Sequence, residues 1–149
     1  MVKDKTGNWE YDLTVDVSSD PTSSEPVVVG EGEFKYQVSG HNWGDLPDGW
    51  FYKEATAVAV DSRDRVYVFN RGPHPMIIFD STGKVLDTWG DGIFSNPHSV
   101  TIGPDGSIYC VDSGDSSVRK FDIAGNLLST IGTPHKPSPK MSGEPFNRP

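Results

Sequence analysis

Hydrophobic residues alternate with smaller or polar residues in short runs between residues 56 and 132. A period of two predicts β-strands with one face more buried than the other. Turn-forming sequences such as Pro104-Asp105-Gly106 separate the runs, because proline, aspartate and glycine each favour turn geometry. No window shows sustained 3.6-residue periodicity, so we expect little helix. The predicted strands lie near residues 56–60, 65–69, 76–79, 85–89, 98–102, 107–111, 118–121 and 127–131.

The same pattern occurs twice. A shift of 42 positions places residues 56–90 on residues 98–132 without a gap, and Tyr67 and Tyr109 are among the identical pairs. A period of about 40 residues that carries four short strands is typical of a β-propeller blade. The sequence therefore predicts an all-β fold of the propeller class with two complete, four-stranded antiparallel blades.

The segments outside the repeats predict an arm, one extra strand and a connector. Residues 1–33 are polar, with serine and proline in the middle, which predicts an arm without a packed core. Alternation over residues 11–17 allows a strand within this arm. Alternation over residues 34–39 predicts an extra strand similar to the last strand of a blade. The proline-rich residues 133–149 predict a connector that opens a third blade, so the partial propeller spans residues 34–149.

Two blades do not close a propeller, which needs roughly 4–8. Each repeat unit also needs neighbours to cover its apolar faces. We therefore expect the remaining blades to come from the same chain, from another chain, or from further copies of this chain that close a ring together. Nine apolar residues are predicted to be buried between blades, namely Val58, Val60, Val66, Val68, Val100, Ile102, Ile108, Cys110 and Phe121.

Composition excludes some partners. The formal net charge is −8, and the acidic residues are spread along the chain, which argues against nucleic-acid binding. No apolar run approaches the length of a membrane span, and residues 1–4 run into polar sequence without the apolar stretch of a signal peptide. Cys110 is the one cysteine, so no intrachain disulfide can form, and its match to Val68 predicts a small core residue. The cellular compartment stays open.

Two polar residues stand at the ends of predicted strands. His98 opens a strand directly after Pro97, and an imidazole in that place could bind zinc or could be a hydrogen-bonded structural residue. Catalytic zinc usually takes three protein ligands, and no other histidine is spaced to form a local pair with His98. Arg71 follows a strand, where a guanidinium could pair with a surface carboxylate or hold a substrate carboxylate.

Three aspartates have two possible roles. Asp61, Asp112 and Asp115 could bind calcium, but the spacing D-x-D-x-D-G of a calcium loop does not occur. Aspartate also forms turns by accepting hydrogen bonds from nearby backbone amides. The sequence therefore favours turn formation for these residues.

The two repeats resemble NHL-type propeller blades. Residues 66–74 (VYVFNRGPH) followed by residues 94–100 (FSNPHSV) resemble, more specifically, the peptidyl-α-hydroxyglycine α-amidating lyase family. The resemblance extends over residues 34–149. It implies a six-bladed propeller with one catalytic zinc, held on the axis by three histidines from different blades.

The resemblance also assigns roles to particular residues. It matches His98 to one zinc ligand and Arg71 to the active-site arginine, so we expect both to face one axial cavity. It implies a structural calcium held partly by backbone carbonyls, which by position are those of Val58 and Val100. The other zinc ligands, a catalytic tyrosine and the calcium aspartate would lie beyond Pro149.

The implied function is that of a zinc-dependent lyase. The family cleaves the carbinolamide C–N bond of a peptidyl-α-hydroxyglycine to give an amide and glyoxylate, so a peptide or a related small molecule is the expected substrate. This chain would supply the N-terminal portion of such an enzyme. Two alternatives stay open, because propellers host many functions: a non-catalytic NHL module that binds a partner, and a short chain that closes a propeller by oligomerisation.

Overall fold

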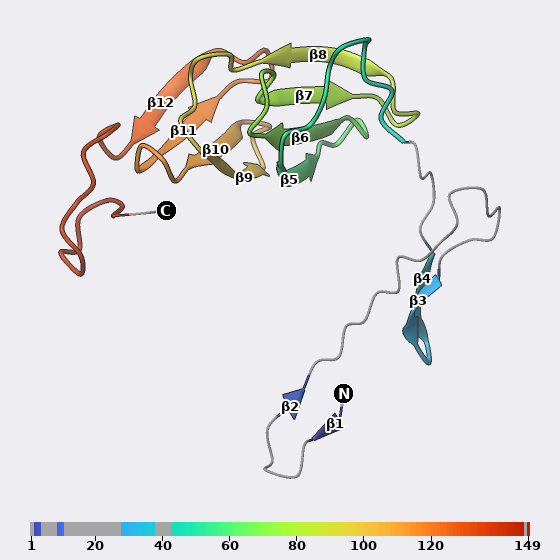
Figure 1. Cartoon of the computed structure of the whole chain (residues 1–149). Helices are drawn as coiled ribbons and strands as arrows, with labels where there is room; N and C mark the ends of the chain where they lie inside the picture. The colour runs from blue at the N-terminus through green and yellow to red at the C-terminus, as the bar shows by residue number, and fades with distance from the viewer. Residues whose placement is uncertain (1, 4–8, 11–27, 38–42, 148) are drawn as a thin grey trace. The chain divides into compact units, whose positions relative to one another are not determined.

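The computed structural model divides the chain into two compact units, Met1–His41 and Asn42–Pro149. The described residues form twelve strands and no helix, so none of them belongs to a helix that could cross a membrane (Figure 1). The chain is therefore all-β in its described part, as predicted. The residues described are 2–3, 9–10, 28–37, 43–147 and 149.

The first unit contains two small antiparallel pairs. β1 (Val2–Lys3) pairs with β2 (Trp9–Glu10), and β3 (Val28–Glu31) pairs with β4 (Phe34–Gln37). β4 is the strand predicted near residues 34–39, but it lies in this hairpin rather than in a four-stranded blade. The expected strand over residues 11–17 lies outside the described residues.

β3 was not predicted, because its residues were assigned to the polar arm. Val28 and Val29 favour extended backbone, and Gly32 then adopts a positive φ of 59° in the turn to β4. A short β-branched run before a glycine turn is a hairpin pattern. The serine-rich and proline-rich composition upstream concealed it.

The second unit contains two four-stranded antiparallel sheets, and these are the two blades (Figure 1). Each observed strand begins and ends within one residue of its prediction. This agreement arises because alternation and the 42-residue repeat independently specify the same bounds. The first blade has the order β5 (Ala55–Val60), β6 (Val66–Asn70), β7 (Met76–Phe79) and β8 (Val85–Trp89), and the second has β9 (Pro97–Ile102), β10 (Ile108–Asp112), β11 (Ser117–Phe121) and β12 (Leu127–Ile131).

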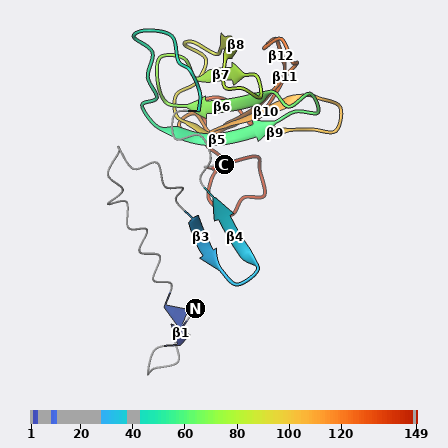
Figure 2. The ribbon, with the colours of Figure 1, turned by 90° about the vertical axis from the view of Figure 1, so that its right-hand side faces the viewer.

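The main hydrophobic core lies between the two blades. β5 and β9 lie side by side, and the small residues Ala57 and Ala59 of β5 pack against this core (Figure 2). Trp89 closes it from the first blade, with its ring centroid 4.8 Å from that of Phe121. The first blade contributes Tyr67, Phe69, Met76 and Ile78, and the second contributes Val100, Ile108, Cys110 and Phe121.

A smaller core lies on the opposite face of the first blade. Leu46 and Trp50, from the loop before β5, pack on Val68, Ile77 and Phe79. The loop is fixed by the Asp45 amide, which donates to the Gly83 carbonyl at 2.8 Å. This loop therefore covers the outer strands of that face.

The inner part of the same face is open. Val58 and Val60 are 57% and 56% exposed, so the prediction that they are buried between blades is wrong for this chain. They pair with Val68 and Val66 and thus point away from the second blade. Their repeat equivalents, Val100 and Ile102, pack in the core shared with the first blade, so the second blade uses this face to contact the first. The other predicted core residues are buried or half-buried.

Aspartates fix several tight turns. Asp61 accepts hydrogen bonds from the amides of Arg63 and Arg65, both at 2.9 Å. Although burial raises the pKa of Asp61, these bonds and the Arg65 guanidinium lower it more, so the net shift is downward. Asp80 and Asp122 accept in the same manner from the amides that follow them. Asp61 is therefore a turn residue, as the sequence favoured.

The open valine face predicts self-association of the chain. Replacing Val58 and Val60 with lysine should shift the chain toward monomer, because charged side chains oppose burial of this face in a contact. Sedimentation of the 149-residue chain over a range of concentrations measures the effect. Leu86→Lys is the matched control, since Leu86 is 50% exposed on the outer strand β8 and should not alter association. A wild-type chain that stays monomeric and melts cooperatively would contradict the prediction.

Candidate functional site

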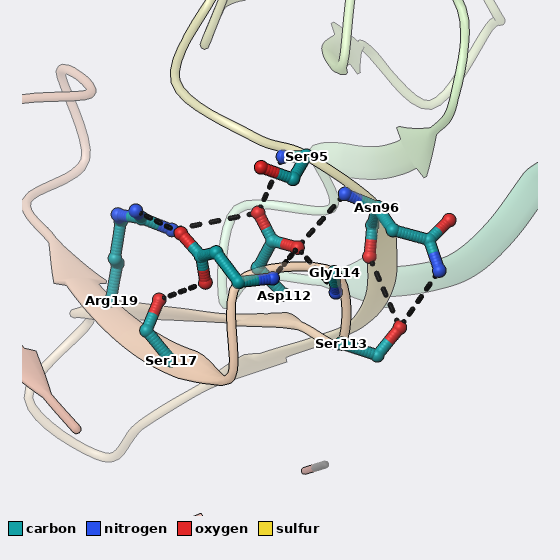
Figure 3. Close-up of polar contacts among 8 residues, drawn as sticks. Ser95, Asn96, Asp112, Ser113, Gly114, Ser117 and Arg119 are labelled. Carbon is teal, nitrogen blue, oxygen red and sulfur yellow. Dashed lines mark hydrogen bonds and ion pairs between the residues drawn. The ribbon is translucent and has the colours of Figure 1, made fainter. Parts of the chain in front are cut away.

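Asp112 ends β10 and is fully buried (Figure 3). Its Oδ1 accepts hydrogen bonds from the amides of Asn96 at 2.8 Å and Gly114 at 2.9 Å. Its Oδ2 accepts from the amide of Ser95 at 2.6 Å. One carboxylate therefore joins the turn after β10 to the loop before β9. Ionised oxygens that accept from backbone amides form bonds stronger than neutral ones.

The buried charge of Asp112 is compensated by an arginine. The Nη1 atom of Arg119 lies 3.6 Å from Asp112 Oδ2, and its Nη2 pairs with Asp115. Ser117 donates from Oγ to Asp115 Oδ1 at 2.6 Å. The Arg119 guanidinium also lies over the Phe94 ring, 5.8 Å from its centroid. We call Asp112, Asp115, Ser117 and Arg119 the Asp112 network.

Gly114 allows the two loops of this network to approach. A Cβ atom at Gly114 would lie 2.7 Å from the Cβ atom of Asn96 and 2.9 Å from its amide nitrogen. Asn96 and Ser113 form further bonds beside it, with Asn96 Nδ2 donating to Ser113 Oγ at 2.9 Å (Figure 3). A side chain at position 114 would therefore push the loop before β9 away.

In the first blade the equivalent turn is held by uncharged residues. The repeat places Asn70, Pro73 and Ile77 on the positions of Asp112, Asp115 and Arg119. The fully buried Asn70 accepts from the Gly72 amide at 2.6 Å and donates to the His74 carbonyl at 2.7 Å. The first blade thus lacks both carboxylates and also the arginine that pairs with them, so this turn holds no unpaired buried ion.

His98 lies on β9, directly after the buried Pro97, and its side chain is exposed. It lines an open hollow of about 1020 Å³, the His98 hollow, together with His135. The described residues contain no group of three histidine, cysteine, aspartate or glutamate side chains that could hold a metal. The assignment of His98 to zinc stays a prediction.

Arg71 lines a different, smaller hollow of about 140 Å³, which also includes Lys53 and Asn96. Its Nε donates to the carbonyl of Pro97 at 3.1 Å, and its Nη1 pairs with the half-exposed Glu54. We expected Arg71 and His98 to face one cavity. In this chain they line two hollows, with Asn96 in the lining of both.

Val58 and Val100 occupy equivalent places on the innermost strands. Val58 pairs with Val68, and Val100 pairs with Cys110. β5 and β9 are edge strands of their sheets, so half of their backbone groups point away from the ladder. The calcium assignment to their carbonyls stays a prediction.

Sequence reasoning missed the Asp112 network: it considered Asp112 and Asp115 as calcium ligands or turn residues and favoured turns. A detectable clue was Arg119 four residues after Asp115 on a strand, where the repeat has isoleucine. Cys110 is buried, as predicted, and burial raises the pKa of its thiol to about 12. At neutral pH the buried thiol is therefore protonated and a weak nucleophile.

The Asp112 network predicts opposite results for partial and complete replacement. Arg119→Ile alone should lower the free energy of unfolding by about 3–5 kcal/mol, because it leaves buried carboxylates unpaired. The triple change Asp112→Asn, Asp115→Pro and Arg119→Ile copies the first blade and should recover most of that loss. Denaturant unfolding measures both. A triple variant less stable than Arg119→Ile would contradict this explanation.

Comparison with known proteins identifies the second blade. Residues 94–121 match the NHL repeat, and this range contains His98 and the whole Asp112 network. Over 103 residues the chain is 31% identical to Protein brain tumor of Drosophila melanogaster. That match covers 68% of this chain and 10% of that protein, so the chain spans about a tenth of that relative. The chain therefore carries an NHL repeat within a partial, all-β propeller.

Proposed function

We propose that the chain supplies two blades of a zinc-dependent propeller lyase that cleaves the C–N bond of a carbinolamide. The observation that carries the proposal is the hydrogen bond from Arg71 Nε to the carbonyl of Pro97. Pro97 directly precedes His98 at the start of β9, so the guanidinium of Arg71 from the first blade is held beside the strand of the second blade that carries the His98 imidazole. The resemblance in sequence assigns these two side chains to catalysis.

Arg71 would bind the carboxylate of the substrate. Among the described residues its Nε and Nη1 have partners, which leaves Nη2 to donate to a ligand. Glu54 is 52% exposed, and an exposed ion pair of this kind contributes only about 0–1 kcal/mol. A substrate carboxylate could therefore replace Glu54 at small cost.

His98 fits one ligand position of a zinc site. Its imidazole is exposed in the His98 hollow, while Pro97 and the Asp112 network hold the start of β9 in place. The described residues supply fewer than three ligands, so other blades must complete the site. Zinc, when bound, would polarise the substrate hydroxyl as a Lewis acid.

The reaction balances without an added oxidant or reductant. The C–N bond breaks, the hydroxyl loses its proton as the carbonyl of glyoxylate forms, and the departing nitrogen gains a proton to give the amide. The residues of this chain would bind the carboxylate and hold the hydroxyl end of the substrate near His98. The competing function, a non-catalytic NHL module, requires neither role.

Variants of His98 and Arg71 distinguish the two functions in the complete native particle. His98→Ala should remove zinc and abolish glyoxylate release from an N-acyl-α-hydroxyglycine, because the metal loses a ligand. His74→Ala is the control histidine, since His74 stacks on Trp50 outside the His98 hollow. Elemental analysis and a glyoxylate assay measure these outcomes. Unchanged zinc content in His98→Ala would exclude the assignment.

Replacing Arg71 should lower turnover and leave the zinc content unchanged. Arg71→Ala should retain zinc and lower kcat/KM by about 10–100-fold, the loss expected for a charge-assisted hydrogen bond of about 1.5–3 kcal/mol. Arg71→Lys should restore little of this, because lysine lacks the bidentate fork. Loss of zinc in Arg71→Ala would instead show a structural role for the arginine.

A further inference from the structure

His74 is held in a constrained turn at one end of the first blade. It stands between Pro73, whose φ is fixed by its ring, and Pro75, whose ring restricts the backbone of the residue before it. Asn70 Nδ2 donates to the His74 carbonyl at 2.7 Å, and the Asn70 amide donates to the Pro75 carbonyl at 2.8 Å. The backbone at His74 is therefore fixed, which gives the imidazole a defined position.

The imidazole of His74 stacks on Trp50, which belongs to the loop before β5. The two ring centroids are 3.7 Å apart, and the ring planes are inclined by 22°. Trp50 also packs on the smaller core of Val68, Ile77 and Phe79, so the stacking contact joins the turn to a loop that is itself anchored on the blade. Protonation of the imidazole would strengthen this contact, because the face of an aromatic ring attracts a cation.

The Nδ1 atom of the same ring is buried and has no hydrogen-bond partner among the described residues. Asp91 Oδ2 lies 3.9 Å from it, which is too long for a hydrogen bond but within the range of an ion pair. Asp91 belongs to the turn after β8, where the Ile93 amide donates to the Gly90 carbonyl at 3.0 Å. The side chain of Asp91 is 64% exposed, so it can rotate toward Nδ1. A bond from Nδ1–H to Asp91 would satisfy a buried nitrogen that is otherwise costly.

Asp91 is the carboxylate best placed to pair with a protonated His74. In the part of the chain that the structure describes, no other carboxylate lies within 4.0 Å of a His74 nitrogen. Arg71, in the same turn, already pairs with Glu54. The other ionisable residues on the segments around the ring are Asp45, Asp48 and Lys53. Protonation of His74 therefore creates one new ion pair, and that pair is with Asp91.

We propose that His74 is a pH-sensitive latch that, when protonated, joins the Trp50 loop and the turn at Asp91 to the end of the first blade. Both nitrogens of a protonated imidazole carry hydrogen, so Nδ1 donates to Asp91 while the charged ring stacks on Trp50. In the neutral ring the charge that attracts Asp91 is absent, and the turn after β8 is held less firmly. Arg71 contacts Pro97 and Glu54 without His74, so the latch does not depend on the proposed catalysis.

Hydrogen exchange of the full chain at about pH 5 and about pH 8, the two ends of the range in which histidine titrates, tests the latch. After correction for the intrinsic exchange rate, a peptide that covers residues 90–96 should exchange about two- to fivefold more slowly at the lower pH, as expected for an ion pair with one exposed partner. His74→Gln and Asp91→Asn should each remove this difference, because neither variant can form the pair.

A matched control separates His74 from the other histidines. His135→Asn removes an imidazole outside the first blade, retains the positive φ of 61° that asparagine tolerates, and should leave the pH dependence of exchange unchanged. Persistence of the wild-type pH dependence in His74→Gln or in Asp91→Asn would overturn the proposal, and so would its loss in His135→Asn. The experiment uses neither zinc nor substrate, so its failure would leave the proposed function untouched.

Discussion

The buried ion pairs between Arg119 and the carboxylates of Asp112 and Asp115 hold together the loops at the end of the second blade that carries His98. A buried charge is tolerated only when it is paired and hydrogen-bonded, and here backbone amides complete the partners of Asp112. The amides of Ser95 and Asn96 belong to the loop that leads into β9. The neighbouring turn at Asp115 and Ser116 forms hydrogen bonds to both ends of the loop over residues 133–147. Removing one charge would therefore disturb two walls of the His98 hollow.

The first blade shows that a blade of this fold can form without the charged arrangement. The first blade holds the same turn with Asn70 and places Ile77 where the second has Arg119. A neutral amide satisfies the turn, but it offers one acceptor oxygen where a carboxylate offers two. The additional acceptor in the second blade reaches the Ser95 amide and so fixes the loop before His98. The charged network thus occurs in the second blade, where the loop before β9 leads directly to His98, the proposed zinc ligand.

Local patterns explain why the strands were predictable and the site was not. Alternation and an ungapped repeat fix strand bounds, because each residue's face follows from its neighbours. They do not say which face meets another blade, so Val58 and Val60 were wrongly placed in a core. Asp112 resembled a turn residue because its contacts to Gly114 are local, whereas those to Ser95 and Asn96 bridge 17 and 16 positions. Only the folded chain brings such partners together.

Hydrogen exchange at the Ser95 and Asn96 amides tests the central claim most directly, that the Asp112 carboxylate holds the loop before His98. In the wild-type chain both amides should be protected, and Asp112→Ala should speed their exchange about tenfold or more, as loss of a charge-assisted bond implies. Asp122→Ala, which removes a turn aspartate at the far end of β11, should leave them protected. Exchange of Ser95 and Asn96 that is equally slow in Asp112→Ala would contradict the claim.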